Sequence, residues 1–302
     1  MITVFGSVNL DLIGGVERLP RPGETVPGNV FRTAPGGKGA NQALAAARAG
    51  GSVRLVGAVG KDDFAAPALE LLQAGGVDLA SIRYVDGATG VALILVDTEG
   101  ENVIAVMPGA NGAMRVEDAE ALQFGPNDVL LLQLEVPVEA ILAAAQGAKA
   151  AGAKVLLNYA PFRADALAVL PHATHLVVNE SECALIAAAL EIEAASVTDQ
   201  ATELGLRLGA SVIATLGKDG VFAVENGRIE MAAALPVQAV DTVGAGDTFC
   251  GYLAAALSEE MLLGAALALA SAAGSLACTK SGAQPAIPAR RDVQAALDEL
   301  SP

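Results

Sequence analysis

Short apolar segments alternate with longer alanine- and leucine-rich segments along this chain of 302 residues. Runs of four or so nearly apolar residues are typical of strands that a parallel sheet buries on both faces. These runs are Ile2–Phe5, Val53–Val56, Val129–Leu132, Val155–Leu157, Leu176–Val178 and Val212–Thr215. The clearest helical segments between them are Asn41–Ala49, Phe64–Ala74, Pro137–Ala151, Ser181–Leu190 and Thr198–Leu208. The alternation predicts one doubly wound α/β domain, with a mainly parallel sheet flanked by helices, over residues 1–302.

Two regions, at about residues 12–34 and 89–106, have strand-like patterns without an intervening helix. In the second, Val91–Val96 and Asn102–Met107 are predicted to pair as a hairpin, with Glu99 and Gly100 in the turn. A small β unit on a large α/β body indicates a lid over a site, and its outer face suits a homodimer contact. The alternative is an ordinary extension of the main sheet.

The net charge of −16 excludes the partners that require a basic surface. Such a chain repels nucleic acid and anionic membranes. The three cysteines have no CxxC spacing, and the only histidines are His172 and His175, so a zinc site or a Ser–His–Asp triad is disfavoured. A site that handles phosphate must therefore rely on local backbone amides and bound cations.

The chain shows no signal-peptide pattern, because Asp11 interrupts the first apolar stretch. The uncharged run Leu262–Cys278 is rich in Ala, Gly and Ser, which favours a buried helix over a membrane span. We therefore expect a cytoplasmic protein.

The segment Asp241–Phe249 (DTVGAGDTF) is the most informative motif, and it precedes a predicted helix over Cys250–Leu257. Glycines at 244 and 246 free the backbone amides to face an anion at a helix start, where the helix dipole also attracts negative charge. A carboxylate at Asp247 can accept the proton of an attacking hydroxyl during phosphoryl transfer. The alternative, that Asp247 is only an N-cap, does not explain the two spaced glycines.

A second glycine motif, Pro35–Asn41 (PGGKGAN), also leads into a helix. It has neither the Walker A spacing nor the GxGxxG spacing of dinucleotide-binding proteins. Near the N-terminus, Asn9 and Asp11 are two residues apart in an extended segment and so face the same side, as a sugar's neighbouring hydroxyls require. An Asx-rich turn is the competing interpretation.

Two further segments follow predicted strands. Asn179 and Glu182 lie at a strand end, where they could orient a hydrated Mg²⁺, although this segment taken alone favours a helix start with acidic residues. The loop Thr215–Gly220 (TLGKDG) contains glycines that suit a passage under a nucleotide.

Together these segments resemble the PfkB carbohydrate kinase family along essentially the whole chain. Its two signatures are matched by GGKGANQALAAARAGGSVRLVGAVG (Gly36–Gly60) and DTVGAGDTFCGYL (Asp241–Leu253). Within the family, GSVNLDLI, PRPGETVPGN, TGVALILVDTEGENVI, LLQLEVP and KSGAQPAIP resemble its ribokinase branch. The resemblance implies a ribokinase-like fold and ATP-dependent phosphorylation of D-ribose at O5, with Mg²⁺ and an activating K⁺.

The resemblance also implies residue roles. Asp247 would be the base, and Gly244, Ala245 and Gly246 would form the anion hole. The implied sugar-binding residues are Asn9, Asp11, Gly37, Lys38, Gly39, Asn41, Glu135 and Asp247. The implied ATP-binding residues are Asn179, Glu182, Thr215, Gly217, Gly220, Gly246 and Ser271. The implied K⁺ ligands, mostly backbone carbonyls, are Asp241, Val243, Ala277, Lys280, Gly282 and Ala286.

Ala286 and Ser271 depart from the serine and the histidine that are usual in the family, so the details of cation coordination and adenine contact stay open. A nucleoside or hexose kinase of the same family is the main alternative, although no aromatic cluster that could hold a base lies near Asn9 or Gly37. A non-catalytic sugar-binding protein and an NAD-dependent oxidoreductase are disfavoured, the first because Asp247 is present and the second because GxGxxG is absent.

Overall fold

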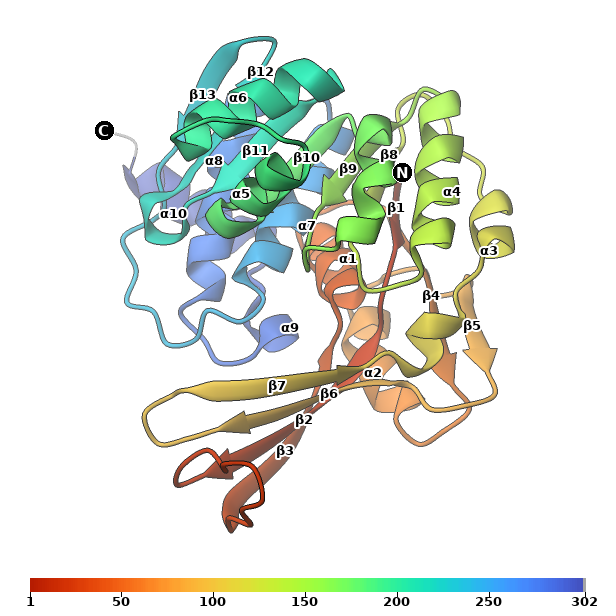
Figure 1. The fold of residues 1–302 in the computed structure, drawn as a ribbon, viewed down its shortest axis with the longest axis vertical. Helices are drawn as coiled ribbons and strands as arrows, with labels where there is room; N and C mark the ends of the chain where they lie inside the picture. The colour runs from red at the N-terminus through yellow and green to blue at the C-terminus, as the bar shows by residue number, and fades with distance from the viewer. Residues whose placement is uncertain (301–302) are drawn as a thin grey trace.

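The computed structural model describes residues 1–300, which form a large sheet between two helical layers and a separate small sheet (Figure 1). The nine strands described in the large sheet run, across the sheet, β13 (Arg228–Ala232), β12 (Val221–Glu225), β11 (Ser211–Thr215), β10 (His175–Asn179), β9 (Lys154–Asn158), β8 (Val129–Leu132), β1 (Ile2–Phe5), β4 (Val53–Gly60) and β5 (Ile82–Val85). From β11 to β5 all neighbours are parallel, whereas β12 and β13 add an antiparallel edge. The predicted α/β class is confirmed.

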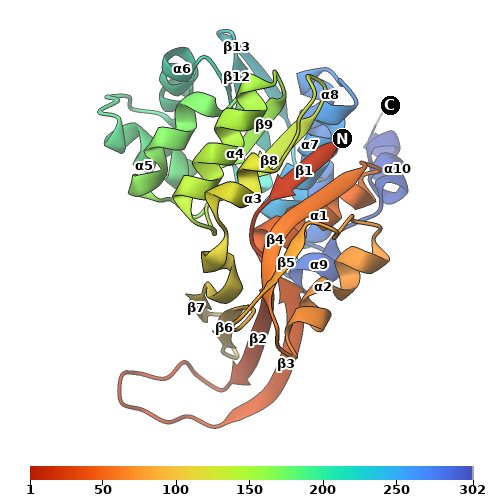
Figure 2. The same ribbon diagram turned by 90° about the vertical axis from the view of Figure 1, so that its right-hand side faces the viewer.

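Two hydrophobic cores lie on opposite faces of the large sheet. Neighbouring residues of β1 alternate between them, since Val4 packs into one core and Phe5 into the other. The first core is covered by α1 (Lys38–Arg48), α2 (Ala65–Ala74), α7 (Ala245–Ser258), α8 (Leu263–Ala277) and α10 (Arg290–Leu300). The second is covered by α3 (Val116–Glu120), α4 (Val138–Ala150), α5 (Glu180–Ala189) and α6 (Val197–Leu208). Figure 2 shows the two layers on either side of the strands.

Short helices complete the connections. They are the 3₁₀ helices η1 (Gly109–Ala113), η2 (Ala164–His172) and η3 (Gly217–Asp219), and the single-turn helix α9 (Ala283–Ala286). The predicted buried helix at 262–278 is α8, whose residues are mostly buried against the first core. None of the helices described in residues 1–300 combines the length and the apolar character needed to cross a bilayer.

The small sheet has the strand order β3 (Gly28–Gly36), β2 (Asn9–Val16), β6 (Gly90–Val96) and β7 (Asn102–Met107). The hairpin predicted from residues 91–107 is the antiparallel pair β6–β7. The small sheet projects from the end of the body at which β1 and β4 finish (Figures 1 and 2). Because β2 follows β1 closely and β3 leads directly into α1, this sheet lies beside the carboxyl ends of the parallel strands.

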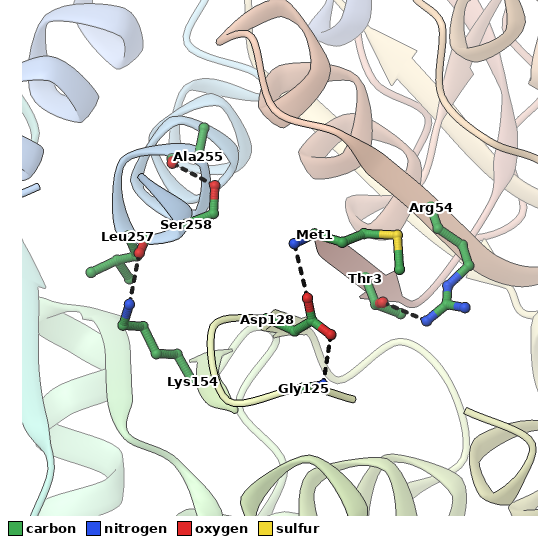
Figure 3. A network of polar contacts seen from close by, with 9 residues as sticks. All are labelled: Met1, Thr3, Arg54, Gly125, Asp128, Lys154, Ala255, Leu257 and Ser258. Atoms are coloured by element: carbon green, nitrogen blue, oxygen red, sulfur yellow. Dashed lines mark hydrogen bonds and ion pairs between the residues drawn. The ribbon is translucent and has the colours of Figure 1, made fainter. Parts of the chain in front are cut away.

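The opposite edge of the body is tied together by polar contacts (Figure 3). The N-terminal ammonium donates to Asp128 Oδ1 at 2.9 Å, and Arg54 donates to Thr3 Oγ1 at 2.8 Å. Lys154 Nζ donates to the backbone oxygen of Leu257 at 2.8 Å, which places a cation at the C-terminal end of α7. This contact fixes the far end of α7, while its N-terminal end points toward the carboxyl edge of the sheet.

Candidate active site

Helix α7 begins at Ala245, five residues before the predicted helix start at Cys250. Its N-cap is Gly244, with a left-handed φ of 78°, and a Cβ there would lie 2.8 Å from the Cβ of Ala283. Within residues 1–300, the amides of Gly246 and Asp247 have no backbone or side-chain acceptor. The cap alternative for Asp247 is therefore wrong, and two free amides mark the helix start.

The carboxylate of Asp247 is 8% exposed and accepts one hydrogen bond on each oxygen. Asn41 Nδ2 donates to Oδ2 at 2.9 Å, and Gln42 Nε2 donates to Oδ1 at 2.9 Å. Both amides come from the first turns of α1, the helix that begins within the glycine motif at 35–41. The structure therefore brings the two glycine motifs, some 200 residues apart in sequence, to one carboxylate.

Glu135 lies after β8 and joins β1 to the start of α1. Its Oε2 accepts from Ser7 Oγ at 2.5 Å and from the backbone amide of Lys38 at 3.0 Å. The Lys38 side chain is close to several carboxylates, and the charge of Asp247, followed by those of Glu135 and Glu182, raises the pKa of Lys38 against the opposing effect of burial. A cation therefore stands beside the candidate base.

Asn9 and Asp11 face the same side of β2, as predicted. Asn9 Oδ1 accepts from Asn111 Nδ2 at 2.7 Å, whereas the Asp11 side chain accepts no hydrogen bond from residues 1–300. Burial, followed by the charges of Glu135 and Asp247, raises the pKa of Asp11 to about 7. A Cβ at Gly36 would collide with the Asp11 carboxylate, so the glycine leaves room for that carboxylate.

Two cavities meet at the start of α7. One, of about 150 Å³, is bordered by Lys38, Asp247, Asn179 and Glu182 among others. The other, of about 440 Å³, is lined largely by apolar groups, and the predicted nucleotide residues Gly217, Gly220 and Ser271 border it. Thr215 and Gly246 border both cavities, so the space beside Asp247 continues into the larger one.

Asn179 and Glu182 form a reciprocal cap at the start of α5. Asn179 Oδ1 accepts from the amide of Glu182 at 2.8 Å, and Glu182 Oε2 accepts from the amide of Asn179 at 2.9 Å. Burial raises the pKa of Glu182, against the opposing effects of that amide and of Lys38. The alternative interpretation, a helix start with acidic residues, therefore accounts for the single side-chain oxygen of Asn179 and for one of the two oxygens of Glu182. Both residues also border the small cavity.

Asp241 joins the two segments that hold the predicted cation ligands. Its Oδ1 accepts from the amide of Val243 at 3.0 Å and its Oδ2 from the amide of Gly282 at 2.8 Å. Ala277 ends α8 and Ala286 ends α9, with the exposed Lys280 between them. In the described part of the chain, no group of three or more His, Cys, Asp or Glu side chains is arranged so that it could hold a metal ion.

Several residues of the site were not predicted from the sequence. They are Ser7, Gln42, Asn111, Gln133 and Asn158. Gln42 follows Asn41 in the glycine motif, and Gln133 is the polar residue in LLQLEVP, so position next to a recognised motif was the available signal.

Comparison with known proteins shows the family of the chain. The family described as "pfkB family carbohydrate kinase" matches residues 1–290. The ribokinase of Haemophilus influenzae is 37% identical to this chain, and the match covers 96% of both proteins. The ribokinase of Bacillus subtilis is also 37% identical, and the match covers 98% of this chain and 99% of that ribokinase. A deoxyribokinase of Salmonella typhi is 32% identical over 95% of both chains.

Solved structures of the same kind superpose closely. The ribokinase of Thermotoga maritima has a TM-score of 0.89 at 34% identity, covering 98% of this chain and 99% of its own. The Arabidopsis thaliana ribokinase complexed with ribose and ATP has a TM-score of 0.86 at 30% identity, covering 98% of both chains.

A carboxylate and free helix-start amides at the junction of two cavities, on this fold, define an enzyme of the kinase class of transferases. The chain belongs to the PfkB family of carbohydrate kinases.

Proposed function

We propose that the protein transfers the γ-phosphoryl group of ATP to O5 of D-ribose, giving D-ribose 5-phosphate and ADP. The observation that carries this proposal is the position of Asp247, whose carboxylate is held by two amides beside the free backbone amides of a helix start. The similarity to ribokinases, including one with ribose and ATP bound, supports the choice of substrates.

Asp247 acts as the general base. It accepts the proton of the ribose 5-hydroxyl while O5 forms a bond to the γ-phosphorus and the bond from that phosphorus to the ADP oxygen breaks. The proton then passes from Asp247 to solvent. The backbone at Gly244, Ala245 and Gly246 forms the anion hole, in which the free amide of Gly246 stabilises the charge that develops on the phosphoryl oxygens.

The sugar lies between the body and the small sheet. Asn9 and Asp11 bind its hydroxyls from β2, and Gly37, Gly39 and Asn41 border it from the start of α1. Lys38 and Glu135 complete this set, joined by the Lys38 amide. The small sheet acts as a lid that limits the access of water, and with it the hydrolysis of ATP.

ATP occupies the larger cavity, with Thr215, Gly217, Gly220 and Ser271 along it. Its phosphates extend toward Asn179 and Glu182 in the small cavity. These two oxygen-bearing side chains suit a hydrated Mg²⁺, which would neutralise phosphate charge when bound.

A K⁺ ion suits the backbone oxygens near Asp241, Val243, Ala277, Lys280, Gly282 and Ala286. Such an ion would supply positive charge next to the loop that leads into Gly244. Exchange of Na⁺ for K⁺ is then expected to raise the rate of the purified enzyme, and an unchanged rate would remove K⁺ from the proposal.

Two measurements test the function. An ATP-coupled assay over ribose, deoxyribose, fructose and adenosine, with the phosphorylated position identified, separates D-ribose from other PfkB-family substrates; the deoxyribokinase relative makes deoxyribose the sharpest competitor. Asp247→Asn is expected to lower kcat by roughly 10³-fold or more while ribose still binds, because the acceptor of the proton is lost. An active Asp247→Asn enzyme would exclude Asp247 as the base.

A further inference from the structure

A chain of buried side-chain amides stands behind Asp247, and Gln42 is at its centre. Gln42 is fully buried. One hydrogen of its Nε2 goes to Asp247 Oδ1 at 2.9 Å and the other to Asn158 Oδ1 at 3.0 Å. Its Oε1 accepts from Gln133 Nε2 at 2.6 Å. Both N–H groups of the Gln42 amide therefore donate a hydrogen bond, and one of them donates to the candidate base Asp247.

The members of this chain come from four separate elements, so the network depends on the tertiary fold. Gln42 is on α1, Gln133 follows β8, Asn158 ends β9 and Asp247 is on α7. Helices α1 and α7 are in close contact one turn beyond Asp247, where a Cβ at Gly251 would lie 2.5 Å from the backbone oxygen of Gln42. This contact leaves little freedom in the position of Gln42 relative to Asp247.

We propose that Gln42 is a positioning residue for phosphoryl transfer, which fixes the rotation of the Asp247 carboxylate and stabilises its charge. The inference rests on the function proposed above. With Asn41 on one oxygen and Gln42 on the other, the carboxylate cannot turn about its Cβ–Cγ bond without breaking a hydrogen bond. Gln42 in turn cannot rotate, because Gln133 and Asn158 hold its two ends.

The charges that surround Asp247 make a neutral donor suitable at this position. The ionisable groups that interact with its charge are Asp11 of β2, Lys38 of α1 and Cys250 of α7. Two more lie nearby: Glu182 of α5 borders the same small cavity, and Glu135 after β8 interacts with Asp11 and Lys38. Lys38 is the one cation among them. A neutral amide holds the carboxylate without adding a further negative charge.

The test compares Gln42→Leu and Gln42→Glu with Gln200→Leu, a control on the remote helix α6, where the amide donates to the backbone oxygen of Ala194. Gln42→Leu is expected to lower kcat about 10²-fold, the usual effect of a small misplacement of a reacting group. Its ribose dissociation constant, measured by calorimetry, stays within about threefold of the wild type, because Gln42 touches the sugar only through Asp247. Gln200→Leu keeps wild-type kinetics.

Gln42→Glu supplies a readout that a merely structural role would not change. At low pH the neutral carboxyl of the variant can donate its O–H to Asp247 Oδ1, whereas at high pH two carboxylates face each other. The ratio of its kcat to that of the wild type should therefore fall at least about tenfold between about pH 6 and about pH 9. The Gln42→Leu ratio lacks this decline, since leucine does not titrate.

The proposal is overturned if Gln42→Leu keeps kcat within about threefold of the wild type, or if it loses ribose affinity in proportion to kcat. It is also overturned if the ratio for Gln42→Glu does not fall with pH, and this variant decides alone if Gln42→Leu fails to fold. Failure of the wild type to phosphorylate ribose would reject the proposed function itself, and a fully active Asp247→Asn enzyme would reject Asp247 as its base. An inactive Asp247→Asn with an active Gln42→Leu would reject this inference alone.

Discussion

Asp247 and Asp11 face the same region from the two parts of the molecule, one from the α/β body and one from the small sheet. Both oxygens of Asp247 accept hydrogen bonds from amides of α1. Asp11 accepts none from residues 1–300, and burial with two neighbouring carboxylates raises its pKa to about 7. The body therefore supplies a carboxylate that its own side chains hold in place, whereas the carboxylate of the small sheet has no such partner among residues 1–300.

The same contrast holds for the apolar side chains of the two parts. Strands such as β1 and β8 are buried along their whole length. In the small sheet, Phe31, Val103 and Ile104 are more than half exposed. In the proposed reaction, the α/β body holds the catalytic groups, which must be fixed where charge changes. The small sheet acts as the lid, which must be able to move or to be covered. The difference in burial between the two parts agrees with these two roles.

The first prediction breaks the rigidity of the body. Gly251→Val should destabilise the protein by about 3 kcal/mol and abolish most activity, because any side chain there meets Ala45 and the backbone of Gln42 on α1. Gly147→Val is the matched control in helix α4, where an added Cβ meets nothing within 4 Å. Denaturant unfolding and kcat of both variants are the measurements, and equal effects in the two helices would contradict the importance of the α1–α7 contact.

Most of the body could be predicted from the sequence, because buried parallel strands read as apolar runs whatever surrounds them. Three strands of the large sheet were not predicted, and their signals differ in strength. β5 (IRYV) is a short edge strand with a charged residue. β12 and β13 are joined by Asn226-Gly227, a dipeptide that is typical of tight hairpin turns and that therefore marks both strands in the sequence.

The candidate site was predictable only where a residue belongs to a motif. Asp247, Asn41 and Lys38 lie in glycine-rich segments whose chemistry is visible locally. Gln133 and Asn158 belong to the site because they hydrogen-bond to Gln42, from which they are 91 and 116 residues away in sequence. A local sequence pattern does not encode contacts over such separations. The predicted start of α7 at Cys250 was five residues late for a related reason. The glycines at 244 and 246 are typical of a loop, whereas the close approach of Gly244 to Ala283 is a tertiary contact that the local sequence does not show.

The second prediction uses the pH dependence of stability to test the contrast between Asp11 and Asp247. Because the folded pKa of Asp11 is raised from 3.8 to about 7, the stability it contributes is complete below about pH 4 and is lost as pH rises through 7. Asp11→Asn should therefore be more stable than the wild type at about pH 8, on the order of 1–3 kcal/mol, with the difference vanishing near pH 4. Thermal unfolding at both pH values measures it.

Ribose binding should respond to pH in the opposite sense. The ionised Asp11 carboxylate is the stronger acceptor for a sugar hydroxyl, so the affinity of the wild type for ribose should rise, by about tenfold, as pH passes from about 5.5 to about 8.5. Asp11→Asn should bind ribose about tenfold more weakly than the wild type at the upper pH, with little dependence on pH. Calorimetric titrations of both proteins would contradict this if their affinities changed in parallel.

The third prediction concerns the exposed apolar side chains of the small sheet, and its expected effect on stability is the smallest. We propose that two copies of the chain associate through the face of the small sheet that carries Phe31 and Val103, which lie exposed at 72% and 54%. The strand register places both side chains on the face opposite to Asp11. Val103→Lys should leave the unfolding free energy within about 0.5 kcal/mol for the monomer but shift the mass from dimer to monomer in sedimentation. Leu206→Lys is the control, since Leu206 is also an exposed apolar residue, on α6 of the body, at 69%. If Leu206→Lys dissociated the dimer and Val103→Lys did not, the contact surface would belong to the body, and the exposed side chains of the small sheet would need a different partner.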